Sequence, residues 1–179
     1  GDDVLRDLTF EVKPGTSVAV VGPSGSGKST LVSLLMRLYE PTDGTVLLDD
    51  YNVQDIKISS LRKHISMVPQ EPVLFSGTIA ENIRYGREGL SAEQIMEAAK
   101  SAELHEFIMS MPAKYESRVE ERGSNLSGGQ KQRLAFAMAI VTNPSILILD
   151  DTTSALDAKT EARIQDTLDR IMEGRTTFV

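Results

Sequence analysis

The residues from Gly22 to Ser29 read Gly-Pro-Ser-Gly-Ser-Gly-Lys-Ser, which fits the spacing GxxxxGK followed by Ser or Thr. The run follows a β-branched stretch and opens a helical pattern, which is the context that this spacing requires. Glycines let backbone N–H groups turn inward around a phosphate, and the helix start adds positive potential. The competing interpretation is a glycine-rich turn with a chance lysine. The predicted phosphate-binding residues are Gly22, Pro23, Ser24, Gly25, Ser26, Gly27, Lys28, Ser29 and Thr30.

Within this loop, we expect Lys28 to reach the β- and γ-phosphates of a nucleoside triphosphate. The hydroxyl of Ser29 should bind Mg²⁺, and Thr30 should support the phosphates. A further Mg²⁺ ligand is predicted at Asp150, which follows the apolar run 146–149. Phosphoryl-transfer enzymes place such an aspartate beside the phosphates, where it holds the metal ion directly or through water. The alternative is an aspartate that only caps a strand or turn.

A second helix start that could bind an anion lies at Leu126-Ser127-Gly128-Gly129-Gln130, which we call the signature segment. Two adjacent glycines precede an amphipathic helix there, so backbone N–H groups would be open to a negatively charged group. Taken alone, the segment could also be an ordinary helix cap that contains glycine.

The surrounding pattern alternates strands with helices, which predicts an α/β fold with a parallel sheet. The segment between Gln70 and Asn143 is rich in helices and predicts an inserted helical subdomain at about residues 71–143. Ser91 is predicted to cap a helix. The expected strands are Val4–Glu11, Ser17–Val21, Thr45–Asp49, Ile65–Val68, Ser145–Leu149 and Thr176–Val179, with Ser17–Val21 buried. The expected helices are Ser29–Leu38, Thr78–Tyr85, Ala92–Ala102, Leu104–Met109, Gly128–Val141 and Ala158–Met172.

Composition limits the possible classes of function. The chain has 179 residues, enough for one domain, and 40% of them are hydrophobic. It contains no cysteine, which excludes disulfides and cysteine-based metal sites. A net charge of −7 argues against a dedicated nucleic-acid-binding protein. No apolar run approaches the ~18 residues that span a bilayer, and Gly1–Asp3 is acidic where a signal peptide would be basic. If this chain works at a membrane, we therefore expect it to dock onto a partner that spans the membrane.

Together with the glycine-rich loop, Asp150 and Ser154–Asp157, the signature segment closely resembles the ABC ATPase family over essentially the whole chain. The resemblance implies a P-loop NTPase (RecA-like) core, residues 1–70 and 144–179, with an N-terminal antiparallel β part. It also implies ATP and Mg²⁺ as ligands. Two cassettes would pack head to tail, with each ATP between the phosphate loop of one and the signature segment of the other.

This resemblance assigns further roles by position. Ser127, Gly128, Gly129 and Gln130 would contact the nucleotide of the partner cassette, and Asp157 would cross the dimer interface. Gln70 would sense Mg²⁺ and the attacking water. A polar residue in the turn after Pro69 is the simpler alternative for Gln70.

Two segments favour an exporter over an importer or a soluble ABC protein of translation or DNA repair. Phe75–Ile83 resembles the exporter segment after the Q-loop, and Glu120–Gly123 resembles the exporter X-loop. Both would touch transmembrane domains, which implies a location at the cytoplasmic face of the cell membrane. A solvated charged loop is the alternative at 120–123, and a small-molecule P-loop kinase would not need the signature segment.

The chain departs from the family pattern at Asp151, where the family has a glutamate that polarises the attacking water. Aspartate is one methylene shorter, and a shift of about 1 Å can cost on the order of 10²-fold in rate. This predicts slow hydrolysis, as in the weakened subunit of a heterodimeric exporter, unless the backbone compensates. The family's switch histidine would follow Val179, and its adenine-stacking aromatic would precede Val4, so we expect truncation at both ends. His64 and His105 are predicted to be surface or helix residues.

Overall fold

The central sheet consists of four parallel strands in the order β1-β8-β7-β4. The computed structural model describes residues 4–150 and 158–179, so the predictions for Asp151 and for Ser154–Asp157 fall outside the described part. The strands are β1 (Ser17–Val18), β4 (Ile65–Val68), β7 (Ile146–Leu149) and β8 (Thr176–Phe178). The sheet confirms the predicted α/β class with a mostly parallel sheet.

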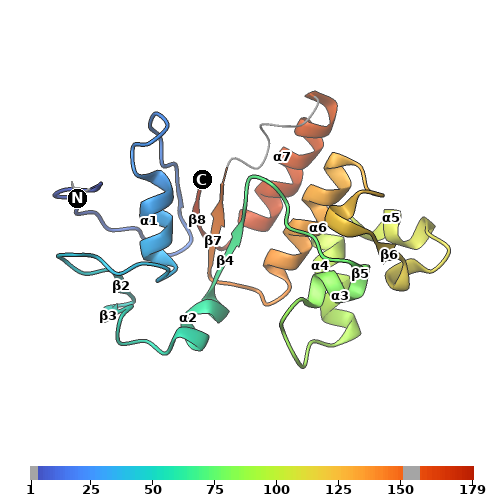
Figure 1. Cartoon of the computed structure of the whole chain (residues 1–179), viewed down its shortest axis with the longest axis horizontal. Coiled ribbons are helices and arrows are strands. Elements are labelled where there is room, and N and C mark those ends of the chain that lie inside the picture. The colour runs from blue at the N-terminus through green and yellow to red at the C-terminus, as the bar shows by residue number, and fades with distance from the viewer. Residues whose placement is uncertain (1–3, 151–157) are drawn as a thin grey trace.

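Helices cover both faces of this sheet (Figure 1). Along β7, Ile148 faces a core cluster that includes Val32 and Leu35 of helix α1, whereas Leu147 faces a larger cluster with Leu134 of helix α6. Successive side chains along a strand point to opposite faces of the sheet, which explains why Leu147 and Ile148 face different clusters. The helices on the two faces are α1 (Lys28–Leu35) and α2 (Ile58–His64) on one side, and α6 (Gly128–Ile140) and α7 (Ala158–Met172) on the other.

The segment between β4 and β7 contains short helices on the right of Figure 1. Three helices carry the capping box in which a hydroxyl and a Glu or Gln side chain satisfy backbone groups at the helix start. Ser91 is one of these caps, as predicted. The elements are α3 (Ile79–Arg84), α4 (Ala92–Ser101), α5 (His105–Ser110), the 3-10 turns Lys114–Glu116 and Glu121–Gly123, and the antiparallel pair β5 (Gly77–Thr78) and β6 (Arg118–Val119).

The predicted strand Val4–Glu11 is wrong, because the structure has no strand in that segment. A strand needs a neighbouring edge for its ladder hydrogen bonds. Here the apolar side chains stay exposed, with Leu8 at 53% and Phe10 at 49%. The antiparallel pair on the α1 side of the molecule is instead β2 (Leu47–Leu48) with β3 (Tyr51–Asn52).

The prediction that Ser17–Val21 is a buried strand is also wrong. Strand β1 has only two residues, and Val21 is 87% exposed. In the described part, β1 lies at the edge of the sheet, with β8 as its one neighbour. Backbone hydrogen bonds from Val20 to Val179 and from Val179 to Val18 extend the pairing a little further. An edge strand has fewer neighbours to cover it than a central one, and its composition alone does not reveal that position.

Among the described residues, no helix combines the length and apolar character that a transmembrane span requires.

Candidate nucleotide-binding site

The glycine-rich loop connects β1 to α1. Gly27, the residue before the helix, has φ 93°, and Gly25 has φ 81°, both in the left-handed region that favours glycine. The ammonium of Lys28 donates hydrogen bonds to the carbonyl oxygens of Gly22 at 2.6 Å and Pro23 at 2.9 Å. The lysine charge therefore lies against the loop that leads into α1. This arrangement suits a phosphate group.

Gly27 is buried, unlike residues 21–26 of the loop, and the N-terminal segment covers it. A Cβ atom at this position would lie 2.7 Å from Cδ2 of Leu5 and 3.2 Å from Cγ1 of Val4. Val4 and Leu5 thus form an apolar wall beside the phosphate loop. The sequence contains no spacing that would have identified Leu5 and Val4, because they lie 22 and 23 positions from Gly27 along the chain.

The predicted magnesium ligands occur on two neighbouring strand ends and at the start of α1. The backbone N–H of Asp150 donates to the carbonyl oxygen of Val68 at 3.0 Å. Gln70 follows Val68 by two positions, so Gln70 and Asp150 leave the same edge of the parallel sheet. Both are exposed, as is Ser29 near the start of α1.

Strand β8 lies between β1 and β7, which places the phosphate-loop strand about 10 Å from the Asp150 strand. A hydroxyl, an amide and a carboxylate are oxygen donors of the kind that Mg²⁺ uses. Mg²⁺ is commonly bound by one or two protein groups together with substrate phosphates. The donor set of Ser29, Gln70 and Asp150 therefore fits a magnesium ion bound with a nucleotide.

The signature segment forms the start of α6. The hydroxyl of Ser127 accepts a hydrogen bond from the backbone N–H of Gln130 at 3.3 Å, and the Gln130 side chain accepts from the Ser127 N–H at 2.8 Å. Gln130 is therefore engaged in the helix cap. Ser127 and Gly128 are exposed, whereas Gly129 is buried. Of the four residues predicted to contact a nucleotide, Ser127 and Gly128 are therefore the exposed ones.

The structure does not bring the two helix starts together within one chain. Helix α1 packs on the Ile148 face of the sheet and α6 on the Leu147 face, and Figure 1 shows them on opposite sides of β7 and β8. The phosphate loop thus lacks a contribution from its own signature segment.

The chain after Gln70 contacts the chain before the signature segment. A Cβ at Gly123 would lie 2.7 Å from Cδ1 of Leu74, so these two segments touch closely. The backbone N–H of Leu126 in turn donates to the carbonyl oxygen of Gly123 at 2.9 Å. Leu74 is 5% exposed. These contacts connect the segment after Gln70 to the segment before α6.

Asn82, which the sequence did not single out, holds the segment between Phe75 and Thr78. Its side chain accepts from the Phe75 N–H at 2.9 Å and donates to the carbonyl oxygens of Phe75 at 2.8 Å and Thr78 at 3.0 Å. Phe75 stacks on Tyr85, with ring centroids 3.9 Å apart and planes within 7°. Tyr85 is 52% exposed, so part of the stacked pair lies at the surface.

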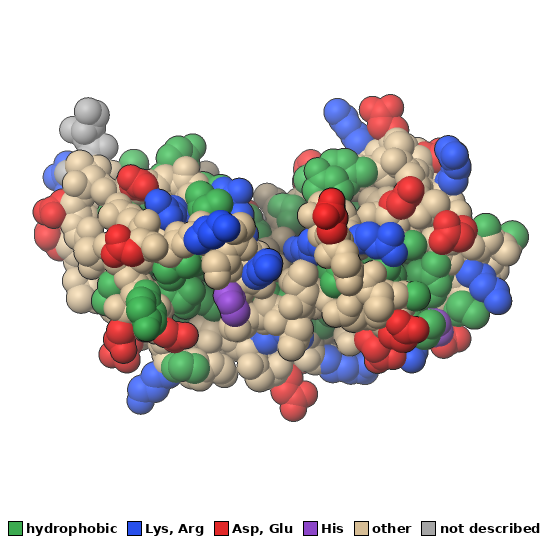
Figure 2. Space-filling view, turned by 90° about the horizontal axis from the view of Figure 1, so that it is seen from below, with side chains coloured by type: hydrophobic (Ala, Val, Ile, Leu, Met, Phe, Trp, Pro, Cys, Tyr) green, Lys and Arg blue, Asp and Glu red, His purple; other side chains and the backbone are tan. Residues whose placement is uncertain are grey.

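Charges of both signs are interspersed over the face seen in Figure 2.

The comparisons with known proteins agree with this geometry. The family model described as ABC transporter matches residues 5–154. The chain is 50% identical to ABC transporter B family member 13 of Arabidopsis thaliana, over 99% of this chain and 14% of the relative. It is 52% identical to the Bacillus subtilis (strain 168) ABC transporter ATP-binding protein YwjA, over 99% of this chain and 31% of the relative.

A solved structure of a bacterial Atm1-family ABC exporter with ATP bound is similar to this chain, with a TM-score of 0.86 and 47% sequence identity. The match covers 98% of this chain and 31% of the exporter chain. The chain thus spans less than a third of the length of these three relatives. With a phosphate loop after β1, an aspartate at the end of β7 and the signature segment at the start of α6, the chain belongs to the ABC transporter family.

Proposed function

We propose that the chain binds MgATP and hydrolyses it as the motor domain of an ABC exporter. The observation that carries this proposal is the placement of the Lys28 ammonium against the glycine-rich loop that leads into α1. A lysine and a helix start together stabilise the negative charge of the β- and γ-phosphates. The solved ATP-bound exporter, at 47% identity, supports the same assignment.

In this proposal, Ser29, Gln70 and Asp150 hold Mg²⁺. Bound by these residues, the ion would supply positive charge that stabilises the phosphates during phosphoryl transfer. Asp151, which lies outside the described residues, would accept a proton from the attacking water. The water oxygen would form a bond to the γ-phosphorus while the bond from that phosphorus to the bridging oxygen breaks, leaving ADP and inorganic phosphate. Gln70 would orient that water.

A second cassette would complete the site. Because α1 and α6 pack on opposite faces of the sheet, Ser127–Gln130 would meet the nucleotide of a partner cassette. We further propose a single domain with a core of residues 1–70 and 144–179 and a helical subdomain at about 71–143. The segments 75–83 and 120–123 would contact transmembrane domains at the cytoplasmic face of a membrane, and no nucleic acid would be bound.

The identity of residue 151 favours one alternative, a cassette that binds ATP but hardly hydrolyses it. The shorter aspartate would leave the water poorly positioned, since a general base needs hydrogen-bond reach first. Such a cassette would serve mainly by supplying its signature segment to a different partner subunit.

Equilibrium binding of MgATP and steady-state phosphate release by the full-length protein test the proposed function. Lys28→Ala should lower ATP affinity and turnover by about 10²-fold or more, because it removes the charge at the phosphates. Lys63→Ala, an exposed lysine of α2 outside the loop, is the matched control and should leave turnover unchanged. ATP affinity equal to that of the wild type in Lys28→Ala would contradict the proposed function.

Asp151→Glu separates the motor from the weakly hydrolysing cassette in the same assay. A rise of about tenfold or more would identify Asp151 as a weakened base. Brisk turnover with either residue would identify Asp151 as a competent one, and the chain as a motor in its own right.

A further inference from the structure

Helix α1 needs an external support to keep its start beside the phosphates. It has eight residues, which makes it about 12 Å long, and none of its side chains is buried. Val32 and Leu35 pack only partly against the core cluster around Ile148. Because α1 is so short, a movement of its C-terminal end that tilts the helix moves Lys28 and Ser29 at the other end by a similar distance. The support must therefore act near the end of the helix.

The end of α1 has an arginine where glycine is the usual residue. The N–H of Arg37 donates to the carbonyl oxygen of Leu34 at 3.0 Å, and the N–H of Leu38 donates to that of Ser33 at 2.8 Å. These are the two bonds of a Schellman motif, whose left-handed position most often contains glycine. Arg37 has φ 51° there. A residue with a side chain is strained in this region and persists when its surroundings hold it.

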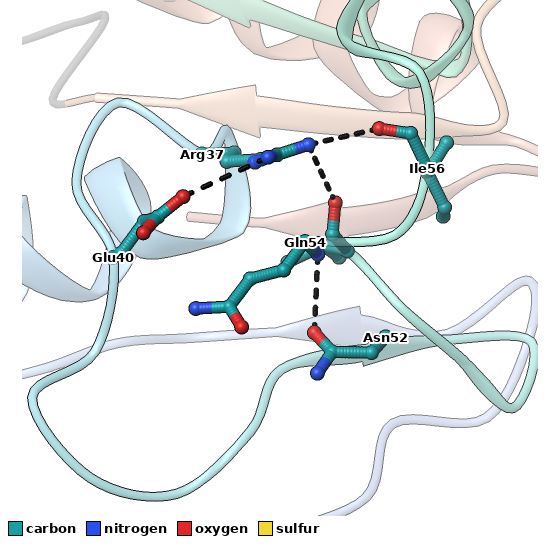
Figure 3. A network of polar contacts seen from close by, with 6 residues as sticks. Arg37, Glu40, Asn52, Gln54 and Ile56 are labelled. Atoms are coloured by element: carbon teal, nitrogen blue, oxygen red, sulfur yellow. Dashed lines mark hydrogen bonds and ion pairs between the residues drawn. The ribbon is translucent and has the colours of Figure 1, made fainter.

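The Arg37 side chain supplies those surroundings (Figure 3). One guanidinium nitrogen donates to the carbonyl oxygens of Ile56 at 2.9 Å and Val53 at 3.2 Å. The other terminal nitrogen lies 3.6 Å from a carboxylate oxygen of Glu40. The Arg37 side chain is 21% exposed, whereas that of Glu40 is 62% exposed. The hydrogen bonds to the carbonyl groups are therefore the better-shielded part of this cluster.

The loop that receives Arg37 is itself held in place. Val53 is 3% exposed and belongs to the same core cluster as Ile148, and its N–H donates to the carbonyl oxygen of Val46 at 2.9 Å. The N–H of Gln54 donates to the Asn52 side chain at 3.1 Å. Arg37 thus connects the far end of α1 to an anchored segment.

We propose that Arg37 is a positioning residue for ATP binding, which fixes the angle of α1 and so the position of the phosphate loop. This inference rests on the proposed function, because it assumes that the loop binds ATP. Arg37 acts through α1 and touches no nucleotide. The gain in positioning explains why the strained arginine stands in a position that glycine would occupy without strain.

Arg37→Gly is the sharpest test, because it removes the side-chain contacts and relieves the backbone strain together. The measurements are the Kd for MgATP, the melting temperature without nucleotide, and KM and kcat for hydrolysis, all on the full-length protein. We expect Kd and KM to rise about tenfold, with kcat at saturation and melting temperature close to those of the wild type. Arg37→Lys should give an intermediate Kd, since an ammonium can reach a carbonyl group but lacks the fork of arginine.

Glu40→Gln is the matched control, because it removes the exposed ion pair and leaves the hydrogen bonds to the carbonyl groups in place. It should bind MgATP as the wild type does. Wild-type Kd in folded Arg37→Gly would overturn the inference and leave the proposed function standing. Should that variant fail to fold, Arg37→Lys decides: a raised Kd with unchanged kcat supports the inference, and a wild-type Kd overturns it. Absence of MgATP binding in the wild type would overturn both proposals.

Discussion

Gly27 has to satisfy a backbone requirement and a packing requirement at once. Its φ of 93° lies in the left-handed region, and its missing side chain leaves room for Leu5. Gly25, two positions earlier in the same loop, shares the backbone requirement with φ 81°, but a Cβ atom there would have nothing within 4 Å. Comparing the two positions therefore separates the cost of backbone strain from the cost of steric contact.

Replacing each of these glycines by alanine should give different losses of stability. Gly25→Ala should lower the free energy of unfolding by about 1–2 kcal/mol, the cost of the left-handed conformation. Gly27→Ala should add a clash with Leu5 and cost about 1–3 kcal/mol more. Urea unfolding without nucleotide measures both values. The double variant Gly27→Ala, Leu5→Ala should recover part of the added loss, and equal losses for the two single variants would contradict the packing argument.

At the scale of elements, the segment before α3 depends on one side chain. Asn82 is 2% exposed and makes three hydrogen bonds to the backbone of Phe75 and Thr78. Without that amide, these partly buried backbone groups would have to find other partners. Asn125 offers a comparison, because it donates to the carbonyl oxygen of Arg118 at 2.8 Å and accepts from the Glu120 N–H at 3.0 Å while exposed to water.

Asn82→Leu should therefore lower the free energy of unfolding by about 2–4 kcal/mol, since it removes the partners of partly buried backbone donors and acceptors at Phe75 and Thr78. Asn125→Leu, its matched control, should cost about 1 kcal/mol, because water can replace the lost partners there. Urea unfolding of the two variants measures the difference. Equal losses of stability at the two sites would show that burial does not determine how much these hydrogen bonds contribute to the free energy of unfolding.

At the scale of the whole molecule, helices α1 and α6 pack on opposite faces of the sheet, so the phosphate loop and the signature segment are separated within one chain. The proposed head-to-tail pairing gives each site a phosphate loop from one chain and a signature segment from the other. Two variants, each defective in one part, should then restore one complete site when they pair. Gly128→Asp suits this purpose, because a carboxylate in the first turn of α6 favours the helix but repels a phosphate.

Lys28→Ala and Gly128→Asp, each inactive alone, should recover hydrolysis when full-length chains with different tags are mixed in equal amounts. With random pairing of independent sites, we expect about a quarter of the wild-type rate, because half of the dimers would have one intact site. The rate of phosphate release measures recovery, and capture through both tags confirms mixed dimers. Mixed dimers without recovery would contradict the head-to-tail arrangement.

Local sequence determined the parts of the protein whose partners are close along the chain. Residues 22–29 specify a glycine loop and a helix start within eight positions, and Ser91 caps its helix as predicted. Strand β4 and helix α7 have the predicted bounds, Ile65–Val68 and Ala158–Met172. Pro69 ends the β4 run, and the α7 segment is strongly amphipathic, so local sequence identifies both elements without knowledge of their neighbours.

Tertiary structure alone decided the features that join distant segments. The apolar pattern of Val4–Glu11 suited a strand, but the described structure provides no edge for it to pair with. Leu5 on Gly27 and Arg37 on the loop at Val53–Ile56 are likewise contacts across many residues. Ladder pairing, close packing and side-chain hydrogen bonds to backbone all depend on which surfaces meet after folding. No local period or spacing encodes that choice, so these parts of the site became visible only in three dimensions.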